Sequence, residues 1–106
     1  MIVTTTEAIE GKKIIKSLGL ARGNTIRARH VGRDIMAALR TLVGGEVMEY
    51  TKLLAETREQ ALDRMIAEAQ RLGANAVVAT RFNTSVVLGG AAELLAYGTA
   101  VVIEDE

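Results

Sequence analysis

The clearest hydrophobic pattern in the chain lies between residues 46 and 72, where apolar side chains recur at helical spacing. They form one stripe, and a face of charged and amide side chains lies opposite it. The stripe consists of Val47, Leu54, Ala61, Met65, Ala69 and Leu72. Gly73 follows, and glycine readily adopts the left-handed conformation just past a helix end. The pattern predicts a helix from about Glu46 to Leu72.

One residue interrupts this stripe. Arg58 lies in its middle, between Leu54 and Ala61. A guanidinium there must extend past its apolar neighbours to water, pair with a carboxylate or carbonyl groups, or lie at a contact with another subunit. We expect a structural pairing for Arg58 and keep a ligand or subunit contact as the alternative.

Strand-like segments precede the helix. Residues 2–5 and 12–20 have the β-branched and apolar composition of strands, and residues 24–31 alternate roughly between polar and apolar positions. The chain contains no proline, so glycine marks the breaks, and residues 21–24 are typical of a turn between the second and third strands.

A short helix is predicted between these strands and the long helix. Asp34 can accept hydrogen bonds from the first turn as an N-cap, and apolar residues share one face of residues 35–43. Gly44-Gly45 then ends the helix.

The C-terminal third of the chain reads as a hairpin. Residues 74–88 and 91–104 flank Gly89-Gly90, which suits a two-residue turn. That turn would place Phe82 opposite Tyr97, Val77 opposite Val102 and Arg81 opposite Gly98. Asn75 precedes the first strand, where a short amide side chain can hydrogen bond to backbone groups.

The last strand is apolar on both faces, with Leu94 and Ala96 on alternate positions from Leu95 and Tyr97. A strand of this kind needs cover on both sides. The two helices can cover one side, and a second copy of the chain is the most economical cover for the other. The pattern predicts an α+β fold: short strands, a short and a long helix, then a C-terminal β-hairpin.

Composition limits the size and chemistry of the protein. The 106 residues suffice for one domain, 1–106, and include no Cys and three aromatic side chains. Disulfides, thiolate nucleophiles and Cys-based metal sites are thereby excluded. The chain has neither an apolar leader near its start nor an apolar run long enough to span a membrane, so we expect a soluble cytoplasmic protein.

Charge is neutral in total but uneven along the chain. Residues 12–40 carry eight Lys or Arg and one acid, whereas residues 41–106 carry five basic and ten acidic residues. We interpret this as complementary faces within the fold or between subunits. The neutral total and the few aromatic side chains make nucleic acid an unlikely partner.

Metal-binding residue types are sparse. His30 is the single histidine, and it lies beside Arg29 and near Arg33, whose charges disfavour its protonated form. Glu46 and Glu49 begin the long helix, where the helix dipole favours carboxylates and where a hard cation is a weaker alternative. His30, Glu46 and Glu49 are therefore weak metal-ligand candidates, with a ring of His30 residues around a symmetry axis as one way to strengthen the site.

The weak candidates for a ligand or subunit contact are Arg58, Asn75 and Arg81. Asn75 is expected to act as a structural joint between helix and strand. Arg58 and Arg81 form the alternative hypothesis of a small-anion pocket at a subunit boundary. The serines have no imidazole partner that a third group could orient, and the glycine pairs match neither nucleotide-binding pattern.

The chain resembles the YbjQ family of small bacterial and archaeal proteins, often labelled heavy-metal-binding. The segments that carry the resemblance are "MIVTTTEAIEGKKI", "VGRDIMAALRTLVGGEVMEYTKLL", "TREQALDRM", "LGANAVVATRF" and "AYGTAVVIE". The resemblance implies an α+β, dodecin-like subunit that assembles into a homopentameric ring. The family often has Asp at the position of Asn83, so this chain lacks one possible oxygen ligand.

These observations favour a non-enzymatic, homopentameric protein that binds a small ligand or metal, or serves as a scaffold. The cofactor is unknown, and a metal ion follows from the family label alone. An enzyme with a site assembled between subunits is the alternative, followed by a nucleic-acid-binding ring that uses residues 12–40.

Overall fold

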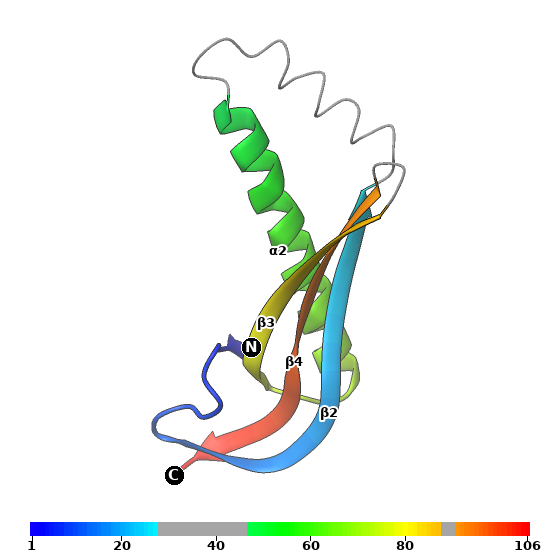
Figure 1. The fold of residues 1–106 in the computed structure, drawn as a ribbon. Helices are drawn as coiled ribbons and strands as arrows, with labels where there is room; N and C mark the ends of the chain where they lie inside the picture. Colours follow the sequence, from blue (N-terminus) through cyan, green and yellow to red (C-terminus); the bar gives the residue numbers. More distant parts are fainter. Residues whose placement is uncertain (28–46, 88–90) are drawn as a thin grey trace.

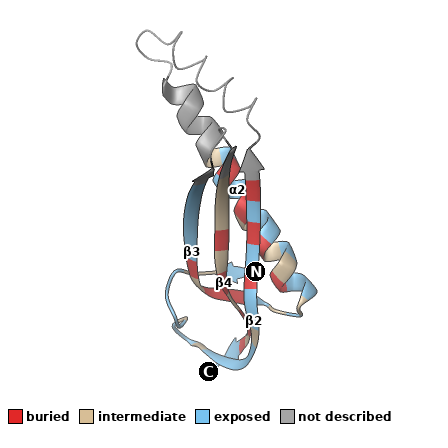
Figure 2. Ribbon diagram, turned by 45° about the vertical axis from the view of Figure 1, so that its right-hand side comes forward, coloured by how far each residue is buried: buried red, intermediate tan, exposed pale blue. Residues whose placement is uncertain are grey.

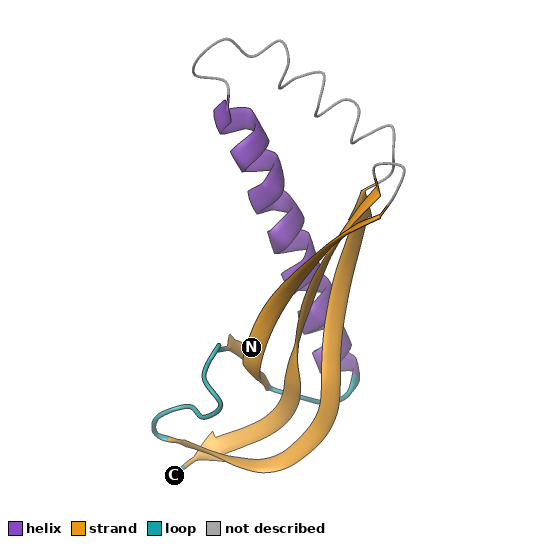
Figure 3. Ribbon diagram, in the orientation of Figure 1, coloured by secondary structure: helices purple, strands orange, loops and turns teal. Residues whose placement is uncertain are grey.

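A computed structural model describes residues 1–27, 47–87 and 91–106 of the chain. Its elements are β1 (Ile2–Val3), β2 (Lys12–Arg27), α2 (Val47–Arg71), β3 (Ala76–Val87) and β4 (Ala91–Asp105). The strands form a four-stranded sheet in the order β1-β3-β4-β2, and α2 lies across one face of it (Figures 1 and 3). β1 runs parallel to β3, and the other pairs are antiparallel. The predicted α+β class is confirmed.

The predicted long helix is confirmed within one residue at each end. Ala61, Met65 and Ala69 of its apolar stripe are fully buried against the sheet. Gly73 has a φ of 91°, the left-handed conformation expected after the helix, and its N–H donates to the Gln70 carbonyl at 3.0 Å. The predicted short helix over residues 35–43 lies outside the described residues.

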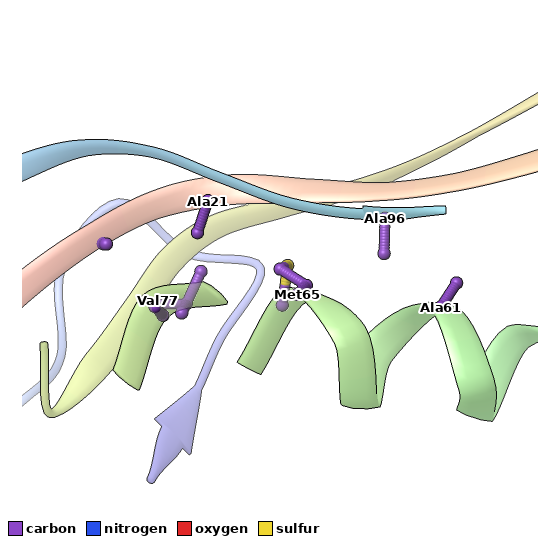
Figure 4. Close-up of a cluster of buried hydrophobic side chains, with 7 residues drawn as sticks. Ala21, Ala61, Met65, Val77 and Ala96 are labelled. Carbon is purple, nitrogen blue, oxygen red and sulfur yellow. The ribbon is translucent and has the colours of Figure 1, made fainter. Parts of the chain in front are cut away.

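The core between α2 and the sheet is built from small side chains. Ala61 and Met65 of α2 meet Ala21 of β2, Ala96 of β4 and Val77 of β3 (Figure 4). α2 packs mainly on β2 and β4 and scarcely touches β3. One side of the sheet is therefore covered unevenly, because α2 diverges from the half of β3 nearest Val87 (Figure 1).

Gly23 is the point of closest approach between the two layers. A Cβ placed on Gly23 would lie 2.2 Å from the Met65 nitrogen and 2.4 Å from the Ala61 carbonyl oxygen. Both are backbone atoms of a helix, which cannot move aside as a flexible side chain can. Only glycine allows β2 to lie this close to α2.

The predicted turn at residues 21–24 is wrong, because β2 continues through it. Ala21 pairs with Gly98, and pairing continues without a break to Arg27 opposite Ala92. Ala21, Gly23 and Thr25 are buried, while Arg22 and Asn24 are exposed, and these alternating bands are visible along β2 in Figure 2. The glycine at this position serves close packing and not a change of direction.

The end of the sheet nearest the C-terminus curves strongly (Figure 1). β2 has register shifts between Ile14 and Lys16 and between Ser17 and Gly19, and the φ of Gly19 is 100°. Bulges of this kind bend a strand. On the sheet face turned away from α2, here called the open face, a second small core of Ala76, Val78, Val101 and Ile103 packs under Ile9.

The hairpin exists, but its predicted register is wrong, by one residue at Arg81 and Phe82 and by two residues at Val77. Phe82 pairs with Ala96, Arg81 with Tyr97, and Val77 with Ala100. Three residues, 88–90, separate the pair formed by Val87 and Ala91, and they lie outside the described residues. A register change of one residue moves every side chain to the other face of a sheet.

Opposite charges meet where β2 and β4 end. Lys12 forms an ion pair and a hydrogen bond with Asp105, and Lys13 lies 3.3 Å from a Glu104 carboxylate oxygen. The side-chain hydrogen bond from Lys12, together with its charge, lowers the pKa of Asp105. Here the basic and acidic segments of the sequence compensate each other within one chain.

Replacing Gly23 by alanine tests the close packing of β2 against α2. Because the new methyl group would overlap helix backbone, Gly23→Ala should lower the free energy of unfolding by about 2 kcal/mol or more. Urea denaturation followed by circular dichroism measures the change. Ser17→Ala, at an exposed position of the same strand, is the control; equal stability of the two variants would contradict this packing.

The Lys12–Asp105 pair predicts a specific pH effect. Because the folded-state pKa of Asp105 is depressed, its stabilising contribution is present above the unfolded-state pKa and is lost as pH falls through the folded value. In an NMR titration of its carboxyl carbon, Lys12→Met should raise the pKa of Asp105 toward its ordinary value. Lys16→Met should leave it unchanged, and an Asp105 pKa insensitive to Lys12 would disprove the pairing in solution.

Candidate functional site

Three polar side chains from adjacent strands form a row across the open face. Tyr97 of β4 pairs with Arg22 of β2 on one side and with Arg81 of β3 on the other. Directly paired residues project to the same face of a sheet, and Arg22 lies between the buried, helix-facing Ala21 and Gly23. The three residues, here called the arginine row, place two guanidinium groups on either side of a phenol.

A second row lies beside the arginine row, toward the hairpin end of the sheet. Leu95 pairs with Asn24 of β2 and with Asn83 of β3. The Asn24 Nδ2 donates to a Glu93 carboxylate oxygen at 3.1 Å. The open face thus presents amide groups next to the two arginines, and its nearest acid already has a hydrogen-bond donor.

Arg81 is held by the N-terminal segment. Its Nη1 donates to the Thr5 carbonyl at 2.8 Å and to the Thr80 carbonyl at 2.9 Å. Among the atoms that the structure describes, its Nε and Nη2 have no hydrogen-bond partner. The guanidinium is therefore fixed at one nitrogen and keeps donors for another group.

A β-bulge next to Arg81 sets the direction of that side chain. The bulge is the register shift between Val78 and Arg81, and Ala79 within it has a φ of 55°, which is uncommon for a residue with a Cβ. The Ala79 N–H donates to the Thr6 carbonyl at 2.8 Å, and the Thr80 N–H to the Thr4 carbonyl at 2.9 Å. Bulges often re-aim a side chain beside a functional site.

The residue opposite the bulge must be glycine. A Cβ on Gly98 would lie 2.6 Å from the Val77 side chain and 2.9 Å from the Val78 carbonyl oxygen. Gly98 therefore makes room for the bulge, and it does not lie opposite Arg81 as the sequence had indicated. The Thr80 hydroxyl is buried here without a hydrogen-bond partner in the described structure, which makes this a costly piece of local architecture.

Asn75 joins the helix to the sheet as the sequence predicts. Its Nδ2 donates to the Ile103 carbonyl at 2.9 Å, and its Oδ1 accepts from the Ile103 N–H at 2.8 Å. Its own N–H donates to the Val101 carbonyl at 3.1 Å. The amide side chain replaces a neighbouring strand at this position of β4, so all its hydrogen bonds are structural.

Arg58 is exposed on α2, and it forms no ion pair with any carboxylate in the described part of the chain. α2 and the arginine row lie on opposite faces of the sheet. A pocket shared by Arg58 and Arg81 would therefore need side chains from two copies of the chain.

The metal-ligand candidates fall largely outside the described residues. His30 and Glu46 lie in the segment 28–46, and the side chain of Glu49 is also outside the described part of α2. Among the side chains that are described, no three His, Asp or Glu are grouped closely enough to hold a metal ion.

The charge of Arg22 acts on one acid of the helix. The pKa of Glu68 is lowered, first by a side-chain hydrogen bond from Arg71 and then by the positive charges of Arg71 and Arg22. Arg71 donates to both Glu68 oxygens, at 3.0 and 2.7 Å. The charge of Arg22 thus reaches around the β2 edge, but Glu68 takes its hydrogen bonds from Arg71.

Two members of the arginine row were missed in the sequence. Arg22 was assigned to a turn, and Tyr97 was paired with Phe82. The signal that could have identified them is the alternation of small and polar residues from Ala21 to Thr25. That alternation is typical of a strand with one face against a helix.

No helix in the described residues is both long enough and apolar enough to cross a membrane.

The chain is similar to known proteins along nearly its whole length. A family model described as "Putative heavy-metal-binding" matches residues 1–104. A UPF0145 protein of Dehalococcoides mccartyi is 60% identical over 104 residues, 98% of this chain and 100% of the relative. A UPF0145 protein of Pyrococcus furiosus is 60% identical over 106 residues, 100% of this chain and 93% of the relative.

Among solved structures, a protein of unknown function of the DUF74 family from Pediococcus pentosaceus has a similar fold. It matches with a TM-score of 0.63 and 18% identity, and the match covers 98% of both chains. At this identity the likeness concerns the fold alone.

Removing the Asn75 side chain tests its structural role. Asn75→Ala leaves the Ile103 N–H and carbonyl without their partners, which should lower the free energy of unfolding by about 1–3 kcal/mol. The Ile103 amide should also exchange its hydrogen faster than in the wild type. Asn83→Ala, an exposed amide on the next strand segment, is the control, and identical Ile103 exchange in both variants would refute the role.

Proposed function

Because the chain belongs to the YbjQ family, we propose that it is a subunit of a homo-oligomeric ring that binds a small ligand without catalysing a reaction. The homopentamer implied by the family resemblance is the assembly that we propose. The observation that carries the proposal is the amount and position of apolar surface that one chain leaves uncovered.

A single chain is too extended for a self-sufficient domain. Its radius of gyration is 17.0 Å and its extents are 55 × 27 × 17 Å, whereas a compact chain of this length has a radius of gyration of about 13 Å. Its accessible surface is 7107 Å², about 1,400 Å² more than a compact monomer of this mass exposes. A stable contact covers about 800 Å² on each partner, so the excess approaches the two contacts that a ring subunit makes.

Among the described residues, the exposed large apolar side chains include two groups on opposite faces of the sheet, in addition to Met1, Ile2 and Ile15. On the open face of β2, Ile14 and Leu20 are 42% and 57% exposed. On the helix side of β3, beyond the reach of α2, Phe82 is 45% exposed. Two different patches support a head-to-tail contact, in which one patch of each copy meets the other patch of the next, and such contacts close into rings.

The heavy-metal description does not fit the described residues well. Zinc and similar ions are held by several Cys, His or carboxylate ligands, and the chain has no Cys and one His. A metal site would need His30, Glu46 or Glu49 from several subunits around the ring axis. Within this proposal Arg58, which is exposed and forms no ion pair with a described residue, serves as a subunit contact, and Asn75 keeps its structural role. A cytoplasmic location stays a prediction from the sequence.

Native mass spectrometry of untagged protein, purified without chelator, tests the assembly. The wild type should give the mass of a pentamer. Phe82→Ser and Leu20→Ser should each give monomers, because each variant lacks one of the two patches. Asp63→Ser, on the exposed side of α2, should leave the mass of the assembly unchanged.

Mixing the two variants is the sharper form of this experiment. Each variant retains the patch that the other lacks, so the mixture should form dimers of one copy of each and nothing larger. A wild-type monomer, or assemblies unaffected by both substitutions, would contradict the proposed ring. Mass in excess of the protein on the wild-type ring would identify a retained ligand.

A further inference from the structure

The two arginines of the arginine row form no ion pair with any residue that the structure describes. Arg81 uses one nitrogen on two backbone carbonyls. The acids closest to the row are engaged elsewhere, since Glu93 accepts from Asn24 and Glu68 from Arg71. Two arginines on one exposed sheet face therefore have free donors.

The spacing of the row suits one compact anion. Neighbouring strands lie about 4.8 Å apart, so the Cα atoms of the two arginines are about 10 Å apart, with Tyr97 between them. Arg22 is long enough to bend toward a group above the Tyr97 ring, and Arg81 keeps its Nε and Nη2 available while its Nη1 stays on the Thr5 carbonyl. The Tyr97 hydroxyl can donate to the same group. The guanidinium fork matches the oxygens of phosphate and carboxylate, and two forks match an anion of two charges.

The second row on the open face, formed by Asn24, Leu95 and Asn83, can contact the rest of a ligand. Asn24 and Asn83 flank Leu95, which gives amide donors and acceptors on both sides of an apolar floor. Such an arrangement suits the hydroxyl groups and carbon skeleton of a small organic molecule. A metal cation would be repelled by the two arginines, so the row does not serve the heavy-metal description.

We infer that the arginine row binds the phosphate group of a small phosphomonoester, with Arg22, Arg81 and the Tyr97 hydroxyl as its donors. The inference rests on the proposed function, because it names the class of small ligand that the ring would bind. Arg81 is held in place by Thr5 before the ligand arrives, whereas Arg22 is free to close over it. Leu20 lies next to Arg22 along the open face, so the site borders the proposed subunit contact.

Isothermal titration calorimetry with glycerol 3-phosphate, in phosphate-free buffer at constant ionic strength, tests this inference on the full chain. The wild type should bind one molecule per chain with a saturable curve. Arg22→Met should weaken binding about ten-fold or more, since one charged hydrogen-bonding group is lost. Tyr97→Phe should weaken it less, because it removes one neutral donor.

Lys16→Met is the matched control. It removes one exposed positive charge of β2 outside the arginine row, and it should leave the affinity unchanged. The inference is overturned if the wild type shows no saturable binding, if Arg22→Met binds as tightly as the wild type, or if Lys16→Met weakens binding as much as Arg22→Met. The last result would mean a general effect of net charge.

The same samples separate this inference from the proposed function. A ring in native mass spectrometry that does not bind glycerol 3-phosphate would refute the phosphate site and leave the ring. A monomer that binds one glycerol 3-phosphate per chain would support the site and refute the ring. Arg81→Lys keeps the positive charge but replaces the planar guanidinium with an ammonium group. Weaker binding with an unchanged fold would show that Arg81 binds through the geometry of its donors as well as through its charge.

Discussion

The contact between Gly23 and the backbone of α2 sets the distance between the two layers of the fold. Because the layers are this close, the space between them admits alanine, valine and methionine and few larger side chains. A thin core of this kind buries little apolar area per residue, and apolar burial is the main source of stability. The close helix–sheet packing therefore leaves one chain poorly stabilised by itself. Association with other subunits would bury more apolar surface and add stability.

The same contact determines which parts of the sheet stay open. α2 is directed along β2 and β4 by the glycine and the alanines that receive it, so it makes few contacts with β3. The far half of β3 then has an uncovered helix side, where Phe82 lies exposed. On the opposite face, the N-terminal segment covers only the end of the sheet near Ile9, and the arginine row stays open.

Local patterns in the sequence predicted the features that local forces determine. The helical stripe, the left-handed Gly73 and the amide joint at Asn75 each depend on neighbouring residues, and the structure contains all three. The continuity of β2 depends on a helix about forty residues later in the chain that receives Gly23. A glycine needed for close packing and a glycine needed for a turn look the same in a sequence. The sequence therefore predicted a turn at residues 21–24, and Arg22 was not recognised as a residue of the open face.

The hairpin register illustrates the same limit with a larger consequence. Without the bulge at Ala79, the ladder that pairs Val77 with Ala100 would continue straight. Arg81 would then face Ala96 on the helix side, and Phe82 would face Leu95 on the open face. The one extra residue reverses both, so that Arg81 joins Arg22 and Tyr97 while Phe82 turns to the uncovered helix side.

A single bulge therefore creates both the charged row and one of the two apolar patches. Its N–H groups are satisfied by Thr4 and Thr6, and its neighbour Arg81 binds Thr5. These three threonines follow β1 in the sequence and precede Ile9, which covers the second core. The position of the N-terminal segment and the register of β3 therefore depend on each other, and the register decides which side chains lie on each face of β3. A ligand that contacts Arg81 and a neighbouring subunit that contacts Phe82 would both act on this one irregularity, which gives ligand binding and assembly a direct physical connection.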